Sequence, residues 1–157
     1  IITTYDWDLV FTKEPTGVTI DRNLNYKCTT TTLPKGASDM IQIAIRGHKI
    51  WQPGIFNYGE NFSLTFVDTK DLGIQKMVKQ WFEKQWSYDS GSQALNSDCY
   101  ADIKIMQLDR QNSNIGGYIL EHCYLQDFSL QDLQGENSAV QTVTINIHYD
   151  RYKTENI

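Results

Sequence analysis

Long extended segments, in which apolar and polar residues alternate, constrain the fold of this chain more than any other feature of its sequence. They occupy residues 40–51, 61–68, 118–130 and 140–152. Successive side chains of a strand point to opposite faces, so a period of two indicates strands with one buried face. Most of these runs exceed the usual strand length of about 5–6 residues. Strands longer than one small core needs suggest a sheet that projects outward and is completed by neighbours.

One segment, residues 71–86, has the spacing of an amphipathic helix. Its apolar residues recur three and four positions apart, at Ile74, Met77, Val78, Trp81 and Phe82. The candidate N-caps are Asp68, Thr69 and Asp71. Several strands on either side of a single helix leave no crossover helices for a parallel sheet. The order therefore predicts a mainly β fold, with two packed antiparallel sheets in a barrel or sandwich and one flanking α-helix.

The chain is expected to form a single domain over residues 1–157, because no linker divides it and no long repeat recurs. Pro53-Gly54 has the composition of a turn between two long strands. The segments on either side of that turn are predicted to form a long hairpin-like unit over residues 39–69.

Charge and cysteine content narrow the possible functions. The net charge is −5, with the acidic excess entirely in residues 71–157, whereas a DNA-binding surface needs the opposite sign. No apolar run approaches the about 18 residues that cross a bilayer, and the N-terminal residues lack a signal-peptide pattern, so no membrane insertion is expected. Cys28, Cys99 and Cys123 lack the spacing of a zinc site and are expected to be reduced thiols.

The sequence carries no pattern that is typical of an enzyme. It has no P-loop, GxGxxG, HExxH or GxSxG motif. Catalytic residues, a cofactor and a metal are therefore not expected. His48, His122 and His148 are isolated in strand-like segments, and structural hydrogen bonding is expected of them rather than a shared metal.

Two patterns leave a carbohydrate-binding or hydrolytic β-sandwich open as an alternative. Asp127 and Asp132 flank a polar run and could form a two-carboxylate glycosidase site, although a solvated strand edge explains them as well. Four large aromatic residues could form a sugar platform: Trp51, Trp81, Phe82 and Trp86. The helical spacing of the last three favours core packing instead.

Residues 28–86 carry a specific order of elements. A Thr-rich strand ends in a Leu-Pro turn, and a basic, polar crossing segment, a Pro-Gly loop, a second strand and a helix with an inward Trp follow. These elements lie at Leu33-Pro34, Ile45–Ile50, Gln52–Gly54, Thr65–Asp68 and Trp81. The order resembles the tail tube proteins of contractile-tailed bacteriophages, a family related to the tube subunits of pyocins and type VI secretion systems. The closing strand, Val143–Tyr149, is similar to the last strand of that family.

The resemblance implies a structural virion protein rather than an enzyme. Six copies would form a ring, and stacked rings would make the inner tail tube, a conduit for DNA during ejection. The implied partners are further copies of the chain, the tail sheath protein, baseplate and tail terminator proteins, the tape measure protein inside the tube, and genomic DNA in transit. The implied location is the phage tail, after assembly in the host cytoplasm. A baseplate tube-initiator and a secretion-system tube protein are the related alternatives.

The resemblance also suggests where copies of the chain touch. The candidates for subunit and ring contacts are Arg46, His48, Lys49, Trp51, Gln52, Pro53, Gly54, Phe56 and Tyr58. Their three aromatic side chains would be the anchors of the interface. The alternative is a plain hairpin tip, whose aromatic side chains fold back onto their own core. In such a tube, an acidic lumen wall would favour sliding of DNA over retention.

Overall fold

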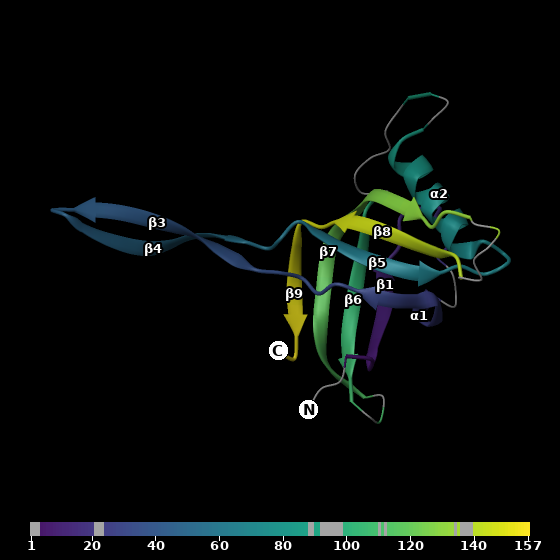
Figure 1. Cartoon of the computed structure of the whole chain (residues 1–157), viewed down its shortest axis with the longest axis horizontal. Helices are drawn as coiled ribbons and strands as arrows, with labels where there is room; N and C mark the ends of the chain where they lie inside the picture. The colour runs from purple at the N-terminus through teal and green to yellow at the C-terminus, as the bar shows by residue number, and fades with distance from the viewer. Residues whose placement is uncertain are drawn as a thin grey trace.

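A computed structural model describes residues 4–20, 24–87, 90–91, 99–109, 111, 113–133, 135 and 140–157. Figure 1 shows a body of strands and one longer helix, from which a two-stranded hairpin projects far to one side. The strands are β1 (Trp7–Lys13), β2 (Cys28–Thr31), β3 (Ala37–Ile45), β4 (His48–Asn57), β5 (Asn61–Val67), β6 (Ala101–Leu108), β7 (Asn114–Leu130), β8 (Thr142–His148) and β9 (Arg151–Glu155). The helices are α1 (Leu24–Lys27), a single turn, and α2 (Gly73–Gln85).

The body is built from two antiparallel sheets that share the long strand β7. The strand order is β1-β6-β7-β8-β5-β2, and β9 pairs with the first half of β7. The first half of β7 also pairs with β6, and its second half pairs with β8. The strand bends between these halves, where His122 has a φ of 54° and the ladder register shifts. These two sheets and α2 confirm the predicted mainly β fold class.

The core lies between the two sheets. In the pair β5–β8, Phe62, Leu64 and Phe66 face Ile147, Ile145 and Val143, and all six side chains are buried. The alternation seen in the sequence thus places one full face of each strand in the interior. The buried side chains of β6 and β7 complete the core from the other sheet, at Ile103, Ile105, Leu120 and Cys123.

Helix α2 buries the stripe that its spacing predicts. Ile74, Met77, Val78 and Trp81 are buried. The helix begins after Leu72, which provides no side-chain cap. Asp68 provides it instead, because its carboxylate accepts hydrogen bonds from the backbone N–H groups of Ile74 (3.3 Å) and Gln75 (3.4 Å).

The C-terminal end of α2 is tied to the second half of β7. The side-chain amide of Gln85 donates to the carbonyl of Leu125 (2.9 Å) and accepts from its N–H (2.8 Å). The ladder between β7 and β8 shifts register just after Leu125. The Gln85 side chain therefore supplies hydrogen-bond partners for the backbone of Leu125 at this irregularity. Trp86 follows the helix and is 52% exposed, so the expected core packing of this tryptophan is wrong.

The structure corrects the predicted pairing within residues 39–69. β3 pairs with β4, whereas β5 pairs with β2 and β8 in the body. The chain reverses at Arg46 and Gly47, whose φ angles of 48° and 80° are those of a two-residue hairpin turn of type I′. Pro53 and Gly54 lie within β4 instead. A proline is tolerated there, since β4 has a free edge and a register shift lies beside it.

The segment expected to be one closing strand, residues 140–152, is divided into β8 and β9. Tyr149 and Asp150 separate the two strands, and both strands pair with β7. The N–H of Asp150 donates to the carbonyl of Glu121 (3.2 Å). This hydrogen bond joins the segment between β8 and β9 to β7 next to its bend. The division allows one segment to run along both sheets.

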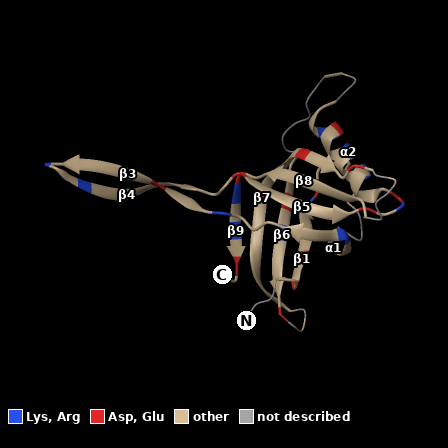
Figure 2. Cartoon of the chain, in the orientation of Figure 1, with Lys and Arg blue, Asp and Glu red and all other residues tan. Residues whose placement is uncertain are grey.

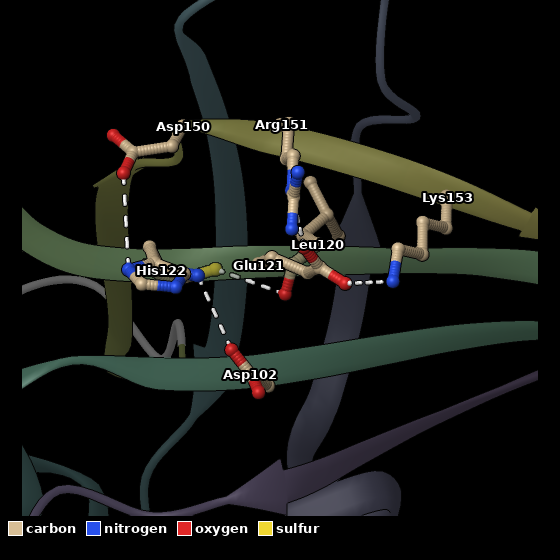
Figure 3. A network of polar contacts seen from close by, with 8 residues as sticks. Asp102, Leu120, Glu121, His122, Asp150, Arg151 and Lys153 are labelled. Carbon is tan, nitrogen blue, oxygen red and sulfur yellow. Dashed lines mark hydrogen bonds and ion pairs between the residues drawn. The ribbon is translucent and has the colours of Figure 1, made fainter.

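A charged network fastens β9 to β7 on the outer face of the body (Figure 3). An oxygen of the Glu121 carboxylate lies 2.5 Å from Nε of Arg151, and the other lies 3.0 Å from Nζ of Lys153. The hydrogen bond from Lys153 and then that from Arg151 hold the pKa of Glu121 below its ordinary value. The lowered pKa means that the ionised carboxylate stabilises the fold.

Replacing this carboxylate, as Glu121→Gln, is expected to lower the free energy of unfolding near pH 7 by up to about 1 kcal/mol. Because the folded pKa lies below the unfolded one, the contribution is present above the unfolded value and is lost as the pH falls through the folded value. Urea unfolding of both proteins at neutral and at strongly acid pH measures it. The control is Glu83→Gln, which removes an exposed pair 3.8 Å from Lys79. An equal loss for Glu121→Gln at both pH values would contradict the network.

Candidate functional site: the projecting hairpin

The hairpin formed by β3 and β4 extends away from the sheets of the body. In the described residues, each of these strands pairs only with the other. Nearly every residue of both strands is exposed, and only Ile43 and Gly54 are half-buried. An isolated two-stranded hairpin is marginally stable in water. The length and exposure of this hairpin therefore indicate that another molecule covers it.

The hairpin presents an exposed face that is rich in isoleucine. The register pairs Ile43 with Ile50, and Ile41 and Ile45 lie on the same face, opposite Gln52 and His48. Trp51, on the opposite face, is 56% exposed, and Ile55 near the base is 79% exposed. Contiguous exposed apolar side chains of this kind mark surfaces that bind proteins.

The base of the hairpin is anchored by aromatic side chains of the body. The hydroxyl of Tyr149 donates to the carbonyl of Tyr58 (2.6 Å), and the ring of Tyr58 lies edge-on to Phe56 (4.8 Å) and Tyr152 (5.5 Å). Gly59 has a φ of 75°, and a Cβ there would lie 2.8 Å from the Tyr149 hydroxyl. Burial of its hydroxyl raises the pKa of Tyr149. The hairpin therefore leaves the body at a well-packed junction.

The nine candidate contact residues lie along one arm and divide into three parts. Arg46, His48 and Lys49 form an exposed basic tip, and Figure 2 shows Lys and Arg in blue toward the outer end of the hairpin. Trp51 to Gly54 follow on β4, where Gln52 lies opposite Ile41 and Pro53 lies opposite Met40.

The last two candidates, Phe56 and Tyr58, lie at the aromatic base. They pack against side chains of their own chain, as the fold-back alternative supposed, and yet both remain more than a third exposed.

The exposed residues of β3 did not appear among the candidates. Met40, Ile41 and Ile45 are about half exposed, and the residues of β4 that face them are exposed as well. Their alternation has the same form as that of a buried strand, so sequence alone does not distinguish them from core residues. The sequence signal that could have identified a projecting hairpin is Arg46-Gly47, a possible turn near the middle of the alternating segment 40–51.

The side chains that the sequence offers for metal binding or catalysis are dispersed. Among the described residues, no group of three or more His, Cys, Asp and Glu side chains could hold a metal ion. His48 lies at the hairpin tip, the ring of His148 lies 3.2 Å from Asn61, and that of His122 lies 3.9 Å from Asp150. Asp127 is hydrogen-bonded to Asn146 at 2.5 Å.

The proposed sugar platform is not assembled. Trp81 is fully buried, with its indole N–H donating to the carbonyl of Cys99 (2.8 Å), whereas Trp51 lies out on the hairpin. These aromatic residues therefore do not form one surface.

The three cysteines are buried. Burial raises the pKa of Cys28 to about 12 and raises that of Cys123 as well. Thiols with raised pKa values are poor nucleophiles, so these cysteines fill the core. In the part of the chain that the structure describes, no helix has the length and apolar character that crossing a membrane requires.

Comparison with known proteins gives one family and one fold. A family profile described as "Phage tail tube protein" matches residues 4–155. A chain in the tube-terminating cap of the anti-feeding prophage has a TM-score of 0.73 at 12% identity, over 100% of this chain and 92% of that one. A chain in the extended sheath-tube complex of the extracellular contractile injection system PVC has a TM-score of 0.69 at 14% identity, over 100% and 93%.

A third solved structure, Hcp1 from Flavobacterium johnsoniae, has a TM-score of 0.54 at 10% identity, over 96% of this chain and 94% of that one. At identities this low, the structural similarity shows a shared fold alone. No curated protein sequence matches the chain significantly.

Proposed function

This chain belongs to the phage tail tube protein family, and we propose that its copies form stacked rings that make the inner tube of a contractile tail. The family match confirms the resemblance seen in the sequence and gives the chain a structural role in a tail or tube. The observation that carries the proposal further is the projecting hairpin of β3 and β4. Its exposed apolar faces require a cover, and further copies of the chain would provide one.

In the proposed assembly, the contacts between copies are made by the segment from Arg46 to Tyr58, together with the facing residues of β3. Trp51 is the proposed anchor, because it is a large aromatic side chain without a ring contact among the described residues. A hairpin that reaches from one copy to a different surface of the next makes a heterologous contact. Such contacts close into rings or continue as a filament. The number of six copies in a ring rests on the family likeness alone.

The proposed tube is a conduit rather than an enzyme. Genomic DNA would pass through the lumen during ejection, with the tape measure protein inside the tube before that. The net charge of −5 supports passage without retention. The similarity to a chain from a sheath-tube complex supports a tail sheath protein as the outer partner. Assembly in the host cytoplasm and incorporation in the virion tail complete the proposal.

A cap or baseplate component is the second candidate. Two of the similar chains come from a tube-terminating cap and from a baseplate of the anti-feeding prophage. A terminating or initiating component would form a single ring and stop there, whereas a main tube subunit would continue to add rings.

Negative-stain electron microscopy of the purified chain over a concentration series tests the proposal. We expect hollow striated tubes above a threshold concentration, because heterologous contacts that do not close on themselves continue. Rings that never stack would favour the cap or baseplate role. A chain that stays monomeric at every concentration would contradict self-assembly.

A further inference from the structure

The tip of the hairpin is a compact basic site. Arg46, His48 and Lys49 lie within four positions around the turn, and all three are exposed. Within the described residues, neither Arg46 nor Lys49 forms an ion pair. The positive φ values of the turn fix the direction in which the two strands present these side chains.

The base of the same hairpin is hollowed and acidic. A hollow of about 380 Å³ lies where the hairpin leaves the body, and its lining residues include the three acidic residues Asp39, Glu60 and Asp150, together with His148. The walls are firm, because Tyr149, which also lines the hollow, donates its N–H to the carbonyl of Glu60 (3.0 Å) and its hydroxyl to that of Tyr58 (2.6 Å). Asp150 lies 3.9 Å from His122, whereas Asp39 and Glu60 form no ion pair within the described residues.

These two features cannot meet within one copy. The nine residues of β3 separate them by about 30 Å at the usual rise of a strand. The exposed tip is basic and the hollow is acidic, so the two ends of the arm are complementary in charge between copies.

We infer that the basic tip of one copy docks in the acidic hollow at the hairpin base of the next copy, an inference that rests on the proposed tube. The contact joins the tip of one copy to the base of the next in a head-to-tail direction, so the same contact can repeat from copy to copy. In this arrangement, the isoleucine-rich face of each hairpin lies against the adjacent copy of the chain. Duplex DNA is the poorer partner for the tip, because two permanent cations on a chain of net charge −5 give little phosphate neutralisation.

Two charge-reversed proteins test the inference. One carries Arg46→Glu and Lys49→Glu at the tip, and the other carries Asp39→Lys and Glu60→Lys in the hollow. Each alone places like charges at the contact, so each is expected to raise the concentration at which tubes form by about tenfold or more. An equimolar mixture restores opposite charges at both kinds of contact, and it is expected to form tubes near the threshold of the unmodified protein. Circular dichroism of each protein checks that the body is folded.

The matched control is Lys76→Glu with Lys79→Glu, which reverses two exposed charges on α2. Its threshold is expected to equal that of the unmodified protein. The inference is overturned if the folded tip and hollow variants each assemble normally, or if their mixture fails. It is also overturned if the tip variant assembles normally and loses only retention of duplex DNA. Absence of tubes from the unmodified protein would instead defeat the proposed function, and this inference with it.

Discussion

A chain in which residues 39–55 are replaced by Asn-Gly is expected to fold as a stable monomer and to form no tubes. The replacement joins Ser38 and Phe56, which face each other across the hairpin, with a two-residue turn suited to that geometry. It keeps the aromatic base and removes the part of the arm whose strands pair only with each other among the described residues. The free energy of unfolding should therefore change by less than about 1 kcal/mol, while assembly is lost.

Thermal unfolding and sedimentation of the shortened chain measure the two effects separately. The control is Leu133→Ser with Trp86→Ser, which removes apolar side chains that are 84% and 52% exposed on the body. This control should assemble normally if the hairpin, and not exposed apolar surface in general, drives the process. Tubes formed by the shortened chain would remove the hairpin from the proposed interface. A shortened chain that unfolds would show that the arm supports its own body.

The second large effect is expected at the centre of the core. Trp81→Ala should destabilise the fold by about 3–5 kcal/mol, because it leaves a cavity where a fully buried indole stood. The substitution also removes the hydrogen bond to the carbonyl of Cys99 and the edge contact with Phe11 at 6.1 Å. A loss of this size is a large part of the stability of a small domain, about 5–15 kcal/mol in total.

Urea unfolding of three variants separates these contributions. Trp81→Phe keeps an aromatic ring and loses the indole N–H, so a smaller loss is expected from it than from Trp81→Ala. Trp86→Ala is the control, since that side chain is half exposed and a change within about 0.5 kcal/mol is expected. Equal losses at the two tryptophans would mean that the helix does not pack as described.

Much of the fold follows from periodicity. Sequence alone assigns the alternating residues of β5 and β8 and the apolar stripe of α2. Burial of one face requires apolar residues at regular intervals along a strand or helix. Trp86 does not follow that rule. The spacing of the stripe extends to this residue, but the helix ends at Gln85, so the side chain turns outward.

The candidate site was only partly predictable, because two physical situations give the same sequence pattern. A strand whose apolar face is covered by its own body and one whose face is covered by another copy both alternate. The alternation of residues 40–51 therefore predicts one long strand, although Arg46-Gly47 reverses the chain within them. Pro53-Gly54 has the stronger turn composition, and it lies in a strand whose free edge tolerates it. The interruption at Tyr149 and Asp150 left no signal of its own, because it depends on the bend of β7.

The projecting hairpin has a consequence for how a tube would begin. A free arm of this kind is marginally ordered, and fixing it costs conformational entropy. Two free copies that meet must both bear this cost for one new contact, whereas a copy that joins an existing end finds its receiving surface already fixed. Growth from a template is then favoured over spontaneous nucleation, in the same way that extending a helix is easier than starting one. The place and time at which tubes appear would be set by whatever supplies the first ring, and the subunit could accumulate in the meantime without polymerising.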